Sequence, residues 1–192
     1  MGILAGWGQW VGRGGARASE PVAPSPAPGP GPAQALRAVD ERIAAFCDKY
    51  SPDIAAQMRE ARARLHALVP RGYELVYDTR DALVLAIGPT PRSADALLSV
   101  VGYPRWVGLF FLHGSGLQAP AGLLQPAGDD RLGLRLRSAA DLSRPDVQAL
   151  LQQAMAARAA AFRSAPPLVT LIKAQALQQR SRRPGRTPRP TV

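Results

Sequence analysis

Two histidines and a single cysteine carry most of the reactive chemistry that this sequence offers. His113 stands where an apolar run meets a Gly-rich loop, and a side chain at such a strand end often faces a cleft. His66 falls beside the apolar stripe of an expected helix, which indicates surface or half-buried packing. Two imidazoles cannot make a three-histidine metal site, and one cysteine forms neither an internal disulfide nor an all-cysteine metal cage. Because Cys47 lies on a helical apolar stripe, we predict a buried and unreactive thiol.

The motifs of common enzyme classes are absent from the sequence. Ser115 follows His113 within His-Gly-Ser, but closeness in sequence does not place an imidazole to accept a serine proton, and the G-x-S-x-G nucleophile motif is missing. Neither a P-loop nor a dinucleotide-binding fingerprint occurs in a suitable context. No nucleophile, base and orienting group can be named together. The sequence therefore assigns no catalytic residue and favours a binding protein over an enzyme.

The aromatic stretch 102–114 supplies the candidate site for a small ligand or a protein partner. It holds one of the three Trp, two of the four Phe and one of the two His. Downstream, three arginines recur at a spacing of two, which in a strand directs them to one face, where they could meet a phosphate or carboxylate. These are Arg131, Arg135 and Arg137; the alternative is a solvated sheet face. If the fold has a cleft, we expect it near Tyr103, Trp106, His113 and Arg135.

The candidate metal site is the acidic pair Asp129 and Asp130. Hard cations prefer carboxylate oxygens, and two adjacent aspartates offer several. The alternative is an ordinary turn, since the pair lies between two expected strands beside Arg131.

Positive charge is concentrated at the C-terminal end. The formal net charge is +10, and residues 147–192 carry eight basic groups and no acidic one, whereas residues 34–146 carry fourteen basic and thirteen acidic groups. Such a tail can neutralise phosphates, so we predict binding of nucleic acid or another polyanion. The residues expected to do so are Arg180, Arg182, Arg183 and Arg186. The tail has no aromatic side chain to stack on bases, which argues against sequence-selective recognition, and a solubilising role is the alternative.

Composition divides the chain into three parts. Residues 1–33 are rich in Gly and Pro and are expected to be disordered, with Trp7 and Trp10 either anchoring on a partner or membrane surface or preceding the true translation start. Residues 34–165 should form one domain, and 166–192 a short helix and the basic tail. No run of eighteen apolar residues occurs, and the start lacks the features of a secretory signal, so we expect a cytoplasmic protein without a membrane span.

Hydrophobic periodicity predicts an α+β domain. Two helices, from Gln34 and from Pro52, show apolar stripes at helical spacing, and a third runs from Val147 to Phe162. About five mostly antiparallel strands are expected at 73–78, 82–88, 97–103, 106–113 and 131–137. The fourth is apolar on both faces, which is typical of an interior strand. One more short helix is expected at 168–177. The helices have one apolar face each and should pack on the sheet.

An ordered series of short matches runs through the chain: 103–111, Gly114, Leu117, 120–124, 135–138, Asp141, Leu142, Pro145, 165–173 and 179–184. The series resembles the YdhG-like family of bacterial domains of unknown function, over roughly residues 36–184. The resemblance implies an α+β fold similar to frataxin, with helices packed on an antiparallel sheet. Some relatives are described as intracellular iron chaperones, so iron is the metal that it implies. Frataxin-like iron binding uses exposed acidic residues, and adjacent acidic pairs here are Asp40-Glu41 and Asp129-Asp130.

Overall fold

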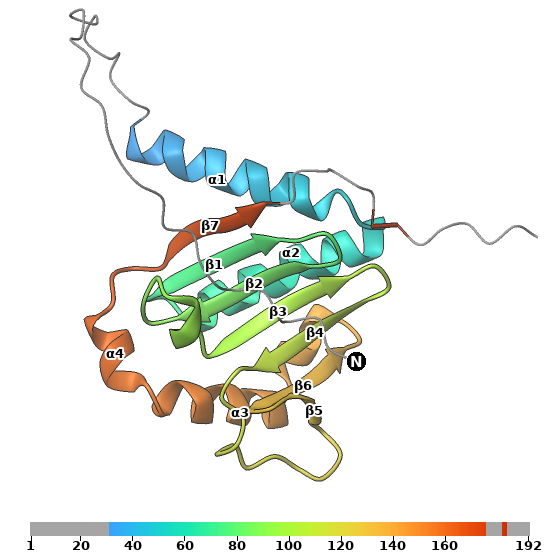
Figure 1. The fold of residues 1–192 in the computed structure, drawn as a ribbon, viewed down its shortest axis with the longest axis vertical. Helices are drawn as coiled ribbons and strands as arrows, with labels where there is room; N and C mark the ends of the chain where they lie inside the picture. Colours follow the sequence, from blue (N-terminus) through green and yellow to red (C-terminus); the bar gives the residue numbers. More distant parts are fainter. Residues whose placement is uncertain (1–30, 176–181, 184–192) are drawn as a thin grey trace, which may run out of the picture.

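A seven-stranded sheet with helices on one face forms the body of the protein (Figure 1). The computed structural model describes residues 31–175 and 182–183. The helices are α1 (Pro32–Cys47), α2 (Pro52–Leu68), α3 (Pro145–Ala156) and α4 (Ala159–Ser164). The strands are β1 (Tyr73–Asp78), β2 (Leu83–Gly88), β3 (Leu98–Tyr103), β4 (Trp106–Phe111), β5 (Gln125–Gly128), β6 (Arg131–Leu136) and β7 (Val169–Gln175). Within the described ranges, no helix is long and apolar enough to cross a membrane.

The sheet is antiparallel except at one edge. Its order is β5-β6-β4-β3-β2-β1-β7, and successive hairpins join β1 through β4. The last strand, β7, returns after the C-terminal helices and pairs with β1 in parallel. Because strands β2, β3 and β4 lie in the interior of the sheet, they are apolar on both faces, as expected for β4 from the sequence.

The main core lies between the sheet and helices α1, α2 and α3. Strand side chains such as Val76, Leu85, Val100 and Leu109 alternate toward this layer, where they meet Met58 and the other buried positions of the helices. The opposite sheet face has a smaller apolar cluster, formed by Leu75, Tyr77, Ala86 and Ala96. The sheet is thus the shared element of two unequal apolar layers.

The two N-terminal helices form as their sequences predict, with some differences at their ends. Pro occupies the first turn of each, and Ser51 adopts the extended N-cap conformation before α2, although its side chain makes no capping hydrogen bond. The expected stripe is buried in the C-terminal half of α1, at Ile43, Phe46 and Cys47, and from Ile54 to Leu65 in α2. However, Leu36 is 60% exposed and Leu68 is 40% exposed, so the apolar contacts do not extend to the outer ends.

The predicted five-strand sheet is incomplete, because two further strands join it. The helix expected at 168–177 is wrong: Val169–Gln175 is strand β7, and Thr170 and Ile172 turn toward the helices. The sequence of residues 169–175 fits the alternation of a strand, but its apolar residues also fit the spacing of a short helix. Strand β5 lies in what was expected to be a loop. The C-terminal helix is interrupted at Ala157 and Arg158, which separates α3 from α4. Because β7 pairs with β1, the sheet includes residues 169–175.

Candidate functional site

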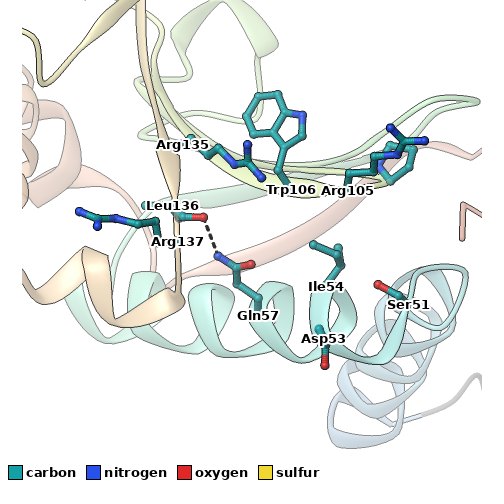
Figure 2. Close-up of a pocket in the computed structure, with 10 residues that line it drawn as sticks. Ser51, Asp53, Ile54, Gln57, Arg105, Trp106, Arg135, Leu136 and Arg137 are labelled. Atoms are coloured by element: carbon teal, nitrogen blue, oxygen red, sulfur yellow. Dashed lines mark hydrogen bonds between the residues drawn. The ribbon is translucent and has the colours of Figure 1, made fainter. Parts of the chain in front are cut away.

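A cleft of about 490 Å³ opens where the start of α2 meets one end of the sheet. One wall is the first two turns of α2, with Ser51, Asp53, Ile54 and Gln57. The opposite wall is made by two segments at the end of the sheet, the β3–β4 turn at 104–106 and the end of β6 at 135–137. Figure 2 shows the two walls facing each other, with Gln57 reaching from α2 toward the main chain of Leu136.

The walls are held together by buried apolar contacts and one polar bridge. Ile54 and Leu136 are buried and belong to the main core. The Gln57 amide nitrogen donates a hydrogen bond to the Leu136 carbonyl at 3.0 Å, which joins α2 to β6. The buried side chains and this hydrogen bond connect the walls of the cleft to the core, so α2 and β6 hold the lining residues in place.

An aromatic stack borders the cleft on the sheet side. Tyr103 and Trp106 are cross-strand partners on β3 and β4, and their rings stack with centroids 4.2 Å apart and planes 20° apart. Phe110 follows on the same face, tilted against Trp106 at 6.4 Å. Burial of the Tyr103 side chain raises the pKa of its hydroxyl. The stack therefore holds the ring of Trp106 in place on the side of the strands away from α2, and Trp106 is one of the residues that line the cleft.

Three arginines give the cleft a positive lining. Arg105, Arg135 and Arg137 are exposed, and among the described residues no carboxylate pairs with their guanidinium groups. Asp53 is the one carboxylate of the described lining. In Figure 2, Arg135 extends beside Trp106, whereas Arg137 points outward from the end of β6.

Many other arginines are already engaged within the fold. Arg62 bonds to Glu74 and Asp40, Arg64 to Glu60, and Arg144 to Asp146. The arginines of the cleft differ from this group because their donors remain available to an external acceptor.

The structure brings together three of the four predicted ligand-binding residues. Tyr103, Trp106 and Arg135 all lie at this end of the sheet. His113 does not join them, because it follows the opposite end of β4, roughly 20 Å away along the strand. Its Nδ1 lies 3.8 Å from Asp130 Oδ2, and the two side chains are 43% and 45% exposed. Sequence reasoning missed the contribution of α2, because nothing local in 51–57 indicates which strand end it will meet.

The predicted metal pair occupies the turn between β5 and β6. Asp130 accepts a hydrogen bond from the Ser115 backbone N–H at 2.8 Å, and this bond holds the pKa of the Asp130 carboxyl below its usual value. Within residues 31–175 and 182–183, no three His, Cys, Asp or Glu side chains gather closely enough to hold a metal ion. Iron binding at Asp129 and Asp130 stays a prediction.

Arg182, predicted as part of a polyanion-binding arm, is buried in the fold. Its guanidinium Nη2 donates to Asp78 Oδ1 at 2.6 Å and also to the Thr79 carbonyl. Its backbone N–H donates to the Lys49 carbonyl at 2.7 Å, and its guanidinium lies 5.1 Å from the Tyr50 ring centroid. Arg183 Nε donates to the Tyr50 carbonyl at 3.3 Å. Arg180 and Arg186, like residues 1–30 with Trp7 and Trp10, lie outside the described residues, so polyanion binding by the tail stays a prediction.

A second buried ionic cluster surrounds Glu74 between β1 and α2. Arg62 donates to both oxygens of the Glu74 carboxylate, Thr170 donates at 2.8 Å, and His66 Nε2 lies 3.0 Å from Oε1. Burial acts to raise the pKa of Glu74, but the hydrogen bonds and charges of His66 and Arg62 outweigh it and hold the pKa at about 2. The surface or half-buried packing predicted for His66 is confirmed.

The prediction for Cys47 is confirmed as far as its burial is concerned. The thiol lies in the main core, and burial raises its pKa to about 11. At neutral pH the nucleophilic thiolate is therefore scarce, and access to it is closed.

No family model, curated protein or solved structure matches this chain. The residues at the cleft are therefore the basis for a functional proposal, and the resemblance to the YdhG-like family stays a prediction.

Proposed function

We propose that this protein is a non-catalytic domain that binds a small anionic ligand, bearing a carboxylate or a phosphate, in the cleft between α2 and the end of the sheet. The observation that carries the proposal is the group of three arginines without carboxylate partners among the described residues. Guanidinium groups bind carboxylates and phosphates through paired N–H donors, and such charge-assisted bonds are stronger than neutral ones.

The positions of the arginines favour a ligand that enters the cleft rather than one that rests on a flat surface. Arg105 comes from the β3–β4 turn, while Arg135 and Arg137 come from β6, so the donors approach from two segments. The positive end of the α2 helix dipole also favours the binding of an anion. Asp53 in the first turn of α2 opposes it and would disfavour highly charged ligands that reach that wall.

A binding role fits the chemistry of the lining better than catalysis does. The described lining contains one carboxylate and one hydroxyl, with no histidine or cysteine. Ser51 has no base beside it in this lining, and His113 lies at the other end of β4. General acid–base or nucleophilic catalysis needs such groups within hydrogen-bond reach of each other.

The proposal is tested by measuring the affinity for simple anions, with inorganic phosphate, citrate and acetate as probes. Isothermal titration and thermal unfolding are complementary, because a ligand present at ~100 times its dissociation constant adds about 2.7 kcal/mol to the free energy of unfolding. We expect the double variant Arg135→Gln/Arg137→Gln to lose at least about tenfold in affinity.

The matched control is Arg131→Gln, which removes one exposed arginine from the same strand about 13 Å from Arg135. It should bind the probes as the parent protein does. Equal losses of affinity in the control and the double variant would indicate a general effect of net charge. Binding that survives the loss of Arg135 and Arg137 would contradict the proposal.

A further inference from the structure

Trp106 is one of the residues that line the cleft, and two glycines, Gly108 and Gly133, lie on the same face of the sheet as its side chain. Tyr103 pairs with Trp106 across β3 and β4, while β6 lies on the other side of β4. A ring stacked on Tyr103 therefore presents its second face toward β6. On this face of the sheet, Gly108 is the next position on β4 and pairs with Arg135 on β6, while Gly133 pairs with Phe110 further along the strands.

Both glycines are required by the aromatic rings. A Cβ at Gly108 would lie 2.7 Å from ring atoms of both Trp106 and Phe110, and a Cβ at Gly133 would lie 2.6 Å from Phe110 Cδ1. Separations this short are excluded sterically, so only glycine lets the rings lie across the strands. The result is a broad aromatic surface that continues from the cleft along β4.

Arg135 places a positive charge at the edge of this surface without covering it. It pairs with Gly108 in the β4–β6 register, and its side chain extends beside Trp106 (Figure 2). Among the described residues the cation–π contacts are those of Lys49 with Phe46 and of Arg182 with Tyr50, so Arg135 does not occupy the face of Trp106. A half-buried aromatic ring and an exposed guanidinium without a carboxylate partner among the described residues are thus adjacent.

We propose that the ligand of the cleft is a planar aromatic anion, whose ring stacks on Trp106 while its carboxylate or phosphate binds Arg135. This inference rests on the proposed function and specifies the class of ligand. The ring of Trp106 suits an aromatic group, and the exposed guanidinium groups suit the anion. An aromatic carboxylate and a nucleotide share this chemistry, and the two are separated by experiment.

The test uses pairs of probes that differ by the aromatic ring. Adenosine monophosphate is compared with inorganic phosphate, and benzoate with acetate. Trp7→Phe/Trp10→Phe leaves Trp106 as the single tryptophan of the chain, so its fluorescence reports contact with the ring. Stacking on a tryptophan should tighten binding by about tenfold relative to the matched anion and quench the emission of Trp106.

Substitution of the aromatic ring separates stacking from folding. In full-length protein with native Trp7 and Trp10, Trp106→Leu should reduce the affinity ratio between each aromatic probe and its matched simple anion from about tenfold toward one, whereas Trp106→Phe should keep part of that ratio. A gain for adenosine monophosphate alone identifies a nucleotide, and a gain for benzoate alone an aromatic carboxylate; either supports the inference.

Two results would overturn it. If phosphate and acetate bind but the aromatic probes bind no more tightly, the ligand class is wrong while the anion-binding function stands. If none of the four probes binds, the proposed function fails together with the inference.

Discussion

Removal of the Arg182 guanidinium should destabilise the protein far more than expected for a residue near a basic C-terminal tail. The change with the least steric effect is Arg182→Met, which keeps the length of the aliphatic chain and removes the charge. In the native protein this side chain, with the Lys49 ammonium, neutralises the Asp78 carboxylate. Asp78 is 0% exposed and Arg182 is 6% exposed, so water cannot replace the lost partner easily.

The magnitude follows from the burial of the pair. Loss of one partner of a buried ion pair costs about 3–5 kcal/mol, because the remaining charge stays desolvated. Lys49 continues to pair with Asp78, which places the expected loss near the lower end, at about 3 kcal/mol. Loss of the contact between the guanidinium and the Tyr50 ring also lowers the free energy of unfolding.

Equilibrium unfolding in urea at neutral pH measures the loss. The matched control is Arg183→Met, which removes the neighbouring charge from an exposed side chain and should cost below about 1 kcal/mol. A double-mutant cycle with Asp78→Asn then isolates the coupling of the pair, which should exceed about 1 kcal/mol. A loss for Arg182→Met no larger than that of its control would refute the reasoning and show Arg182 to be solvated.

Two further predictions concern the buried carboxylate and the glycines beneath the aromatic surface. Because the pKa of Glu74 is lowered to about 2 from 4.5, its contribution to stability is fully present above about pH 5 and is lost as the pH falls from there toward 2. Glu74→Gln should therefore flatten the acid limb of a plot of unfolding free energy against pH, and an unchanged acid limb would show that another group causes it. Gly133→Ala should lower the free energy of unfolding by about 1–3 kcal/mol, because the new methyl group would lie 2.6 Å from Phe110 Cδ1. Gly116→Ala is its control, since a Cβ there meets no atom within 4 Å, and equal thermal unfolding of the two variants would contradict the proposed packing.

The helices and strands that could be predicted from the sequence were those whose hydrophobic periodicity fits only one kind of element. Residues 131–136 alternate cleanly and residues 73–78 alternate except at Val76, and both are strands in the structure. Residues 169–175 carry apolar side chains at spacings that fit a strand and a short helix alike. Their pairing with β1, through Thr170 and Ile172, decides in favour of the strand, and this partner lies almost a hundred residues away in the chain. Local pattern cannot supply that information.

The candidate site was predictable only where its residues come from one hairpin. Tyr103 and Trp106 are three positions apart across a turn, so their contact follows once the hairpin is recognised. Gln57 and Leu136 are 79 residues apart, and their contact depends on how α2 packs over the sheet. His113 was grouped with Trp106 because the two are close in sequence. A strand separates neighbouring positions by about 3.3 Å per residue, and this places them at opposite ends.

The distribution of ion pairs explains why the composition of residues 34–146 does not indicate a positively charged cleft. Residues 34–146 are almost neutral in sum, yet their carboxylates are used unevenly. Asp40 and Glu74 are engaged by Arg62, Asp146 by Arg144, and Asp78 by Lys49 together with Arg182 from the C-terminal end. A carboxylate in such a pair does not neutralise the arginines at the end of the sheet. The recruitment of Arg182 is part of the same arrangement, because it supplies from the tail a cation that the body would otherwise have to provide. A body with balanced charges can therefore hold a locally positive site, and the tail can contribute to folding as well as to net charge.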